Sequence, residues 1–302
     1  MEEEKKESEI TGKLSKYKKI SYTEELIKER LEALEEQEHK YDNLDSYKTM
    51  LSLIDLTTLN TQDTDEKVID MCKKVNGFKS AFPALPNVGA ICVYPPFASV
   101  VKANLTAEHV GIASVSACFP SSQSFLKTKL LETQLVIKDG ATEIDIVISV
   151  GKFLEGKKEE VYNEIYQIKK VAKDQHLKVI LETGALKDPQ LIREASLVAM
   201  EAGADFIKTS TGKMDPPATP MAMLVMCDAI KEFNEVNEKK IGIKPAGGIA
   251  TPQDAQKYFT LVVETLGDQY ASNKLFRIGA SRLANNLLHK ILTLQVQNSK
   301  YF

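Results

Sequence analysis

The chain has 302 residues, of which 43% are hydrophobic and 27% charged, an ordinary composition for a globular protein. Its formal net charge is −3, so no excess of positive charge favours nucleic acid or an anionic membrane as a partner. No apolar run approaches the roughly 20 residues of a membrane span, and the charged start MEEEKKESEI lacks the apolar core of a secretory signal. We therefore expect a soluble, cytoplasmic protein.

Residues 1–48 differ from the rest of the chain because they are rich in Glu and Lys. Helical periodicity over residues 21–41 predicts a helix, and Ser21 with Glu24 has the spacing of a capping box. We expect a charged helical extension that packs loosely on a domain formed by residues 49–302. A helix that binds a partner protein is the alternative.

From residue 49 onward, eight strand-like apolar runs alternate with segments of helical periodicity. The runs cover residues 51–56, 88–95, 111–119, 143–149, 177–184, 204–210, 241–245 and 276–281. Such alternation is typical of a parallel sheet, and eight units in about 250 residues predict an α/β protein with a closed (β/α)8 TIM barrel. An open doubly wound sheet is the alternative, but the first run lacks the Gly-rich turn of its dinucleotide-binding form.

Charged residues stand inside several of these apolar runs, and we single out four of them. In EIDIVIS the isoleucines share one face, so Asp145 points to the other face, the barrel interior. The same alternation directs three further side chains inward, those of Asp55, Lys208 and Lys244. Burying an ion costs several kcal/mol even when it is paired. We therefore interpret the four groups as catalytic, with purely structural salt bridges as the alternative.

Two lysines on adjacent strands indicate a particular chemistry. A lysine is nucleophilic only when it is neutral, and its pKa of about 10.4 falls with burial or beside another cation. Lys208 and Lys244 would have this effect on each other. A neutral lysine converts an aldehyde into an iminium and then an enamine, which is aldolase chemistry, and Asp145 is placed to move protons directly or through a water.

Glycine-rich loops predict a phosphate site. In barrel enzymes phosphate often binds in the loops after strands seven and eight, where glycines let backbone N–H groups approach the anion. The candidates follow the sixth and seventh strands or lie in and directly after the eighth: Gly212, Lys213, Gly247, Gly248, Gly279 and Ser281.

Metal catalysis is not indicated by the sequence. No two of the four histidines have ligand spacing, and none ends a predicted strand. The four cysteines are scattered, which fits buried thiols in a reducing compartment. We expect neither a metal nor another cofactor.

The motifs at these positions resemble those of deoxyribose-phosphate aldolases over about residues 50–292. The resemblance rests on IDLTTLN, AICVYP, DGATEIDIVIS, LKVILETG, ADFIKTSTGK, IGIKPAGGI and FRIGAS. It implies a class I aldolase on a (β/α)8 barrel that cleaves 2-deoxy-D-ribose 5-phosphate to acetaldehyde and D-glyceraldehyde 3-phosphate. It also implies a role in deoxyribonucleotide catabolism and a homodimer, without metal or organic cofactor.

The resemblance assigns roles to individual residues. Lys208 in FIKTSTGK resembles the Schiff-base lysine, Lys244 in GIKPAGG the lysine that tunes it, and Asp145 the proton-shuttling aspartate. Asp55 resembles an aspartate near the sugar hydroxyls, and Cys92 a cysteine close to the aldehyde site. The six residues proposed above for phosphate resemble the phosphate pocket of the family.

Four positions set this chain apart from many members. Pro96 and Ala250 stand where many have Arg, and Arg282 where many have Ser. Because the last two border the predicted phosphate site, phosphate affinity is expected to differ, and Arg282 offers a guanidinium to the anion. Some members use a C-terminal tyrosine, for which Tyr301 is a weak counterpart.

Two other functions remain open on the sequence. The first is a related Schiff-base aldolase with a different phosphorylated acceptor. The second is a catalytically weak homologue that acts as a scaffold through the charged N-terminal helix.

Overall fold

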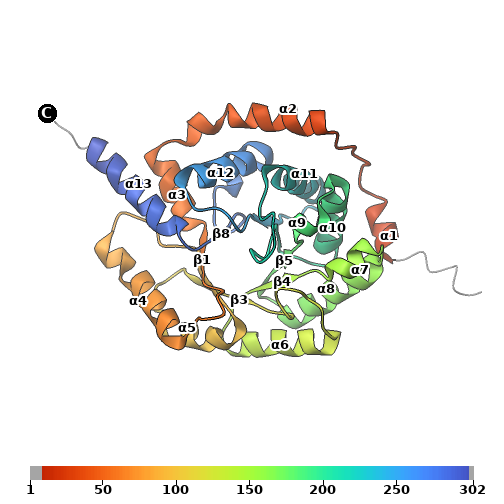
Figure 1. The fold of residues 1–302 in the computed structure, drawn as a ribbon, viewed down its shortest axis with the longest axis horizontal. Helices are drawn as coiled ribbons and strands as arrows, with labels where there is room; N and C mark the ends of the chain where they lie inside the picture. The colour runs from red at the N-terminus through yellow and green to blue at the C-terminus, as the bar shows by residue number, and fades with distance from the viewer. Residues whose placement is uncertain (1–8, 299–302) are drawn as a thin grey trace, which may run out of the picture.

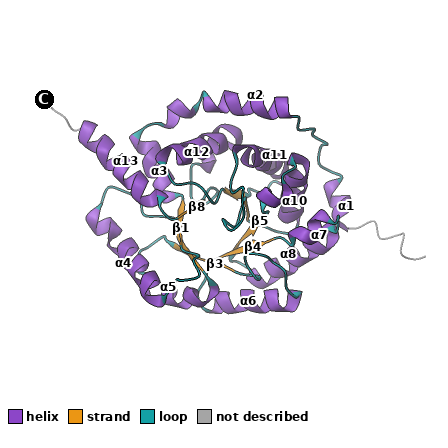
Figure 2. Cartoon of the chain, viewed as in Figure 1, coloured by secondary structure: helices purple, strands orange, loops and turns teal. Residues whose placement is uncertain are grey.

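The computed structural model describes residues 9–298, in which eight parallel strands form a barrel surrounded by helices (Figures 1 and 2). The strands are β1 (Ile54–Thr57), β2 (Ala90–Val93), β3 (Gly111–Val115), β4 (Glu143–Val147), β5 (His176–Ile180), β6 (Phe206–Lys208), β7 (Gly242–Lys244) and β8 (Ile278–Ala280). Each pairs with its neighbours in parallel register, and parallel bridges Ile243–Phe276 and Ala246–Gly279 join β7 to β8. The predicted (β/α)8 barrel is confirmed, and the open-sheet alternative is wrong.

Helices follow the strands and form the outer layer. They are α4 (Asp65–Ala81), η2 (Pro95–Phe97), α5 (Ala98–Asn104), α6 (Leu126–Lys138), α7 (Val150–Leu154), α8 (Lys158–Ala172), α9 (Thr183–Leu186), α10 (Pro189–Glu201), α11 (Pro220–Asn237), α12 (Pro252–Leu266), η3 (Asp268–Tyr270) and α13 (Leu283–Asn298). Three of them start with a capping side chain followed by Pro: Asp188, Thr219 and Thr251 each accept a hydrogen bond from the first helical turn. A capping side chain followed by Pro fixes the residue at which the loop ends and the helix begins.

The N-terminal segment wraps around one side of the barrel as α1 (Glu9–Leu14), α2 (Glu24–Glu35), η1 (Glu38–Tyr41) and α3 (Leu44–Ser52). Helix α1 contacts α8 and α10, whereas α2 crosses α11 and α12 (Figure 1). Arg30 on α2 donates two hydrogen bonds to Asp228, at 2.6 and 2.7 Å. The extension is therefore fastened to the barrel by a bidentate ion pair.

Two local predictions for this segment are wrong. The side chain that caps α2 is Thr23, which accepts from the N–H of Leu26, so Ser21 and Glu24 form no capping box there. The first strand begins at Ile54, because residues 51 and 52 complete helix α3. Both errors are shifts of two or three residues, the usual uncertainty of local signals at helix and strand ends.

The barrel interior is packed below the level of the strand ends. Phe206 is buried on β6, and a Cβ atom built on Gly242 of β7 would lie 2.3 Å from its ring. The missing side chain at residue 242 therefore makes room for the Phe206 ring. None of the helices in the described part of the chain combines the length and apolar character that a membrane crossing requires.

Candidate active site

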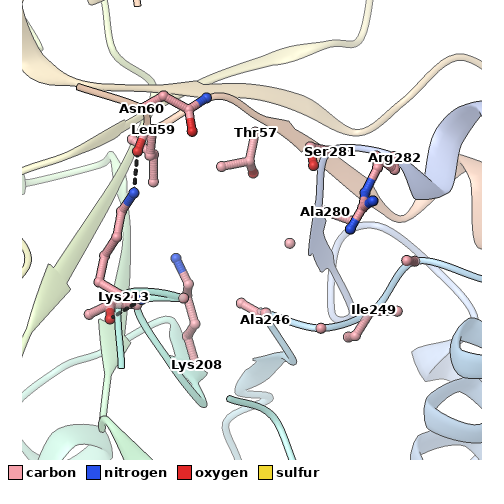
Figure 3. Close-up of a pocket in the computed structure, with 16 residues that line it drawn as sticks. Thr57, Leu59, Asn60, Lys208, Lys213, Ala246, Ile249, Ala280, Ser281 and Arg282 are labelled. Carbon is pink, nitrogen blue, oxygen red and sulfur yellow. Dashed lines mark hydrogen bonds between the residues drawn. The ribbon is translucent and has the colours of Figure 1, made fainter. Parts of the chain in front are cut away.

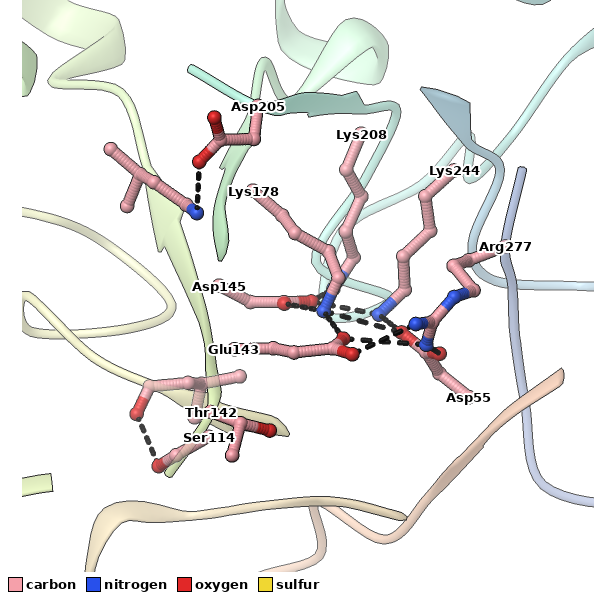
Figure 4. Close-up of polar contacts among 12 residues, drawn as sticks. Asp55, Ser114, Thr142, Glu143, Asp145, Lys178, Asp205, Lys208, Lys244 and Arg277 are labelled. Carbon is pink, nitrogen blue, oxygen red and sulfur yellow. Dashed lines mark hydrogen bonds and ion pairs between the residues drawn. The ribbon is translucent and has the colours of Figure 1, made fainter. Parts of the chain in front are cut away.

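Seven ionisable side chains meet inside the barrel (Figure 4). They come from six strands or their ends: Asp55, Glu143, Asp145, Lys178, Lys208, Lys244 and Arg277. Each is at most 6% exposed to solvent. The predicted convergence of Asp55, Asp145, Lys208 and Lys244 is confirmed, and three more charged groups join them.

Asp145 lies at the centre of this charge cluster. Its Oδ2 accepts hydrogen bonds from Nζ of Lys208 and Nζ of Lys244, both at 2.8 Å, and its Oδ1 accepts from Lys178 at 2.9 Å. Asp55 forms a second centre, contacted by Lys244 at 2.5 Å and Arg277 at 2.6 Å. Lys244 therefore touches two carboxylates, whereas Lys208 touches one.

The charges of the cluster do not balance if every group is ionised. Three carboxylates face four basic groups, so the cluster is neutral when one base has lost its proton. A buried net charge is costly. Lys208 is the base with the fewest carboxylate contacts and therefore the one that this balance favours in the neutral form.

The surroundings shift the pKa values of Lys208 and Lys244 in opposite directions. Burial lowers the pKa of Lys208, and the nearby Lys244 lowers it further, which together outweigh the contact with Asp145. Burial also disfavours the charged form of Lys244, but Asp145 and Asp55 dominate, so its pKa is raised. Burial opposes ionisation of Asp145, yet Lys178, Lys208 and Lys244 hold its pKa well below the usual range. The cluster thus contains a permanent carboxylate, a cationic lysine and a lysine biased toward the nucleophilic form.

A cavity of about 250 Å³ opens beside Lys208 at the carboxyl ends of the strands (Figure 3). Its wall includes all six residues proposed for phosphate binding: Gly212, Lys213, Gly247, Gly248, Gly279 and Ser281. Ala250 and Arg282 also line it. Of the seven charged groups in the cluster, Lys208 alone lines the cavity, so it is the one exposed to a bound ligand.

The cavity wall presents unpaired backbone donors. Gly212, Gly247 and Gly248 have φ values of 74°, 84° and 77°, a left-handed backbone that glycine adopts without a steric penalty. Within residues 9–298 their N–H groups meet no protein acceptor. Concave groups of free backbone N–H donors bind anions, and the N-terminus of helix α13, at Leu283, directly follows Ser281 and Arg282 of the cavity wall.

Lys213 spans the edge of this cavity. Its ammonium donates to the carbonyl of Leu59, which follows β1 (Figure 3). The contact ties the loop after β6 to the loop after β1. The positive charge of Lys213 is therefore held at the rim, on the same wall as the free N–H groups.

The remaining predicted site residues lie away from the cavity wall. Asp55 and Cys92 are completely buried and do not line the cavity. Burial raises the pKa of the Cys92 thiol, which packs in a small apolar cluster with Leu59 and Val115. Pro96 is exposed in η2 and does not line the cavity, and Tyr301 lies outside the described residues.

Three members of the charge cluster were not singled out from the sequence, although strand alternation indicates all of them. Lys178 stands between the buried Leu177 and Val179, and Glu143 lies two residues before Asp145. Arg277 stands in the same way between the buried Phe276 and Ile278. No group of three or more His, Cys, Asp or Glu residues suited to a metal ion occurs in the part of the chain that the structure describes.

Comparison with known proteins identifies the family. Residues 49–285 match the model of the DeoC/LacD family aldolases. A Caenorhabditis elegans protein is 42% identical over 264 residues, which is 87% of each chain, and the human deoxyribose-phosphate aldolase is 41% identical over 256 residues, covering 80% of this chain and 79% of its own. The solved structure of the tetrameric deoxyribose phosphate aldolase from Aeropyrum pernix has a TM-score of 0.66 and 26% identity, covering 86% of this chain and 97% of its own. The chain therefore belongs to the DeoC/LacD aldolase family and is an aldehyde-lyase.

Proposed function

We propose that this chain cleaves 2-deoxy-D-ribose 5-phosphate reversibly to acetaldehyde and D-glyceraldehyde 3-phosphate through a Schiff base on Lys208. The observation that carries the proposal is the position of Lys208, whose Nζ lies between the cavity and the carboxylate of Asp145. Its lowered pKa supplies a neutral amine at lower pH than a free lysine would. The names of the human and Aeropyrum pernix relatives support the substrate.

In the first half of the reaction, Lys208 attacks the aldehyde carbon C1 of the open-chain sugar. Loss of water from the carbinolamine gives an iminium. Asp145, through a water, accepts the proton of the C3 hydroxyl as the C2–C3 bond breaks. The bonding electrons move into the iminium and form an enamine, and glyceraldehyde 3-phosphate leaves.

In the second half, the enamine takes a proton at C2 and becomes the iminium of acetaldehyde. Water then adds to the iminium, acetaldehyde leaves, and Lys208 is restored. Lys244 is suited to pass the protons because it shares Oδ2 of Asp145 with Lys208. No metal or organic cofactor enters these steps.

The substrate phosphate is assigned to the glycine-lined wall of the cavity. The three free N–H groups, the ammonium of Lys213 and the region of Ser281 supply donors there. Because Asp55 and Cys92 are buried and do not line the cavity, we assign them to the floor of the site, where Asp55 acts through Lys244.

A trapping experiment tests this function. The protein is incubated with acetaldehyde, reduced with borohydride, and analysed by intact mass and peptide mapping. We expect one ethyl group on Lys208, none in the Lys208→Leu variant, and one in a Lys290→Leu control on the outer helix α13. An adduct on Lys244, or no adduct on folded protein, would contradict the assignment.

The proposal also includes an oligomeric state and a cellular compartment. We propose a homodimer in the cytoplasm that works in deoxyribonucleotide catabolism. Residues 49–302 form its catalytic barrel and residues 1–48 a charged helical extension. The four cysteines are free, which agrees with a reducing compartment. Light scattering after size exclusion measures the assembly, and a monomer or tetramer would overturn the dimer.

A further inference from the structure

Glu182 has an unusual backbone at the edge of the site. It follows β5 with φ 55° and ψ 59°, a left-handed conformation that residues other than glycine rarely adopt, and it is 5% exposed. The proposed reaction steps do not use its carboxylate. Unfavourable backbone conformations that persist next to a cavity often serve a function there.

The carboxylate of Glu182 binds one residue of the cavity wall twice. It accepts a hydrogen bond from the hydroxyl of Thr211 at 2.6 Å and another from the Thr211 N–H at 3.2 Å. Thr211 Oγ1 in turn accepts from the N–H of Lys213 at 3.0 Å. A continuous chain of hydrogen bonds thus runs from Glu182 through Thr211 to Lys213, and Thr211, Gly212 and Lys213 all line the cavity.

The turn that carries Glu182 also packs against the loop after β6 at Gly184, two residues after Glu182. A Cβ atom on Gly184 would lie 2.2 Å from the carbonyl oxygen of Pro216. The turn after β5 and the loop after β6 therefore meet backbone to backbone, so a shift of one displaces the other.

Glu182 does not serve to balance charge. Among residues 9–298 it forms no ion pair, unlike the three carboxylates of the charge cluster. A buried carboxylate without a cationic partner is costly. Its hydrogen bonds to Thr211 are therefore the contacts that account for its presence in this turn.

We propose that Glu182 is a positioning residue that fixes Thr211–Lys213 for phosphate, so that it sets the preference for phosphorylated over unphosphorylated substrates. It occupies both donors of Thr211, which leaves Gly212 as the residue with a free N–H among Thr211, Gly212 and Lys213, and the Thr211 hydroxyl holds the Lys213 backbone in place. The inference rests on the proposed function, because it assumes that the cavity wall binds a phosphate.

The test compares two substrates and three variants. Glu182→Met removes both acceptors, Glu182→Gln keeps one carbonyl acceptor, and Thr183→Val is the matched control in the same turn. The Thr183 hydroxyl is buried and finds no hydrogen-bond partner among the described residues, so valine replaces it without losing a contact. kcat and KM are measured with 2-deoxyribose 5-phosphate and with 2-deoxyribose.

We expect Glu182→Met to raise KM for the phosphorylated sugar about tenfold, the usual effect of losing hydrogen bonds that order a charged-ligand site, while kcat/KM for 2-deoxyribose stays within about twofold. Glu182→Gln should recover part of the loss, and Thr183→Val should match the unmodified protein. Equal losses on both sugars, or none with either Glu182 variant, would overturn the inference.

A binding measurement separates this inference from the proposed function. Inorganic phosphate should raise the Tm of the unmodified protein and of Thr183→Val, and raise that of Glu182→Gln clearly less. If the unmodified protein fails to cleave the sugar but shows this pattern, the proposed function fails and the role of Glu182 stands. If all three proteins respond equally to phosphate, the role of Glu182 fails whatever the activity.

Discussion

Lys208 and Lys244 are paired in register on β6 and β7, and their Nζ atoms share one oxygen of Asp145, each at 2.8 Å. They differ in a single further contact, because Lys244 alone also reaches Asp55. One additional carboxylate is therefore what separates a lysine with a raised pKa from a lysine with a lowered pKa.

Replacing Lys244 with Met should move the pH dependence of catalysis. Only neutral Lys208 attacks the aldehyde, so kcat/KM rises with pH through the pKa of Lys208. Removing the neighbouring cation raises the pKa of Lys208, so the pH range over which kcat/KM rises should shift to higher pH. Turnover should also fall by about 100-fold, the scale of a lost proton-transfer group. A pH–rate profile measures both effects, and a pH range that stays in place or moves to lower pH would contradict the coupling.

Replacing Lys178 with Met should destabilise the barrel strongly. Lys178 contacts Glu143 at 2.5 Å and Asp145 at 2.9 Å, and its removal takes one cation from each of these two buried carboxylates, leaving Glu143 with Arg277 alone. We expect the free energy of unfolding in urea to fall by about 3–5 kcal/mol. Lys73→Met, which removes an exposed pair with Asp70, should cost at most about 1 kcal/mol. Equal losses in the two variants would show that the cluster adds nothing to stability.

Gly242→Ala should disturb the packing below the site. The new methyl group would overlap the ring of Phe206, and such overpacking typically costs about 1–3 kcal/mol. Adding Phe206→Leu should restore part of the lost Tm, because the smaller side chain frees the space. Differential scanning calorimetry of the two single variants and the double variant measures the coupling. Strictly additive changes would rule out the contact as the cause.

The variant Arg282→Ala tests whether the Arg282 side chain binds the substrate phosphate. The Arg282 side chain lines the cavity opposite Lys213 (Figure 3). If it binds the anion, KM for the phosphorylated sugar should rise about tenfold, with KM for 2-deoxyribose unchanged. Lys290→Ala, on the helix α13 that follows Arg282 and paired with Asp42, is the control. An unchanged KM in Arg282→Ala would assign the phosphate to the glycine loops alone.

The strands and the inward direction of four charged side chains could be predicted, because successive side chains of a β-strand point to opposite faces of the sheet. Asp145 among isoleucines has only one face available to it, whatever the rest of the chain does. The partners of each charge could not be predicted in this way. Whether Lys244 meets one carboxylate or two depends on the barrel register and on closure between β7 and β8, which no local pattern encodes.

The cavity wall, too, could be predicted only where it does not depend on contacts between residues far apart in the sequence. Glycines in the loops after β6 and β7 and within β8 indicated an anion site, because their position in a barrel is informative by itself. Glu182 was not singled out, since its importance comes from a left-handed backbone and from contact with Thr211, 29 residues away. The shifted cap at Thr23 is a smaller case, in which two suitable capping residues lie two positions apart.

The contact between Asp55 and Arg277 joins residues 222 positions apart in the chain. During synthesis Asp55 is made long before Arg277, and it stays without its guanidinium until β8 reaches its place between β1 and β7. Long-range pairings of this kind form late and slow the search for the native state. The last strand to be synthesised thus brings the guanidinium partner of an aspartate on the first, so the charged surroundings of the reactive amine are complete only when β8 has joined the barrel.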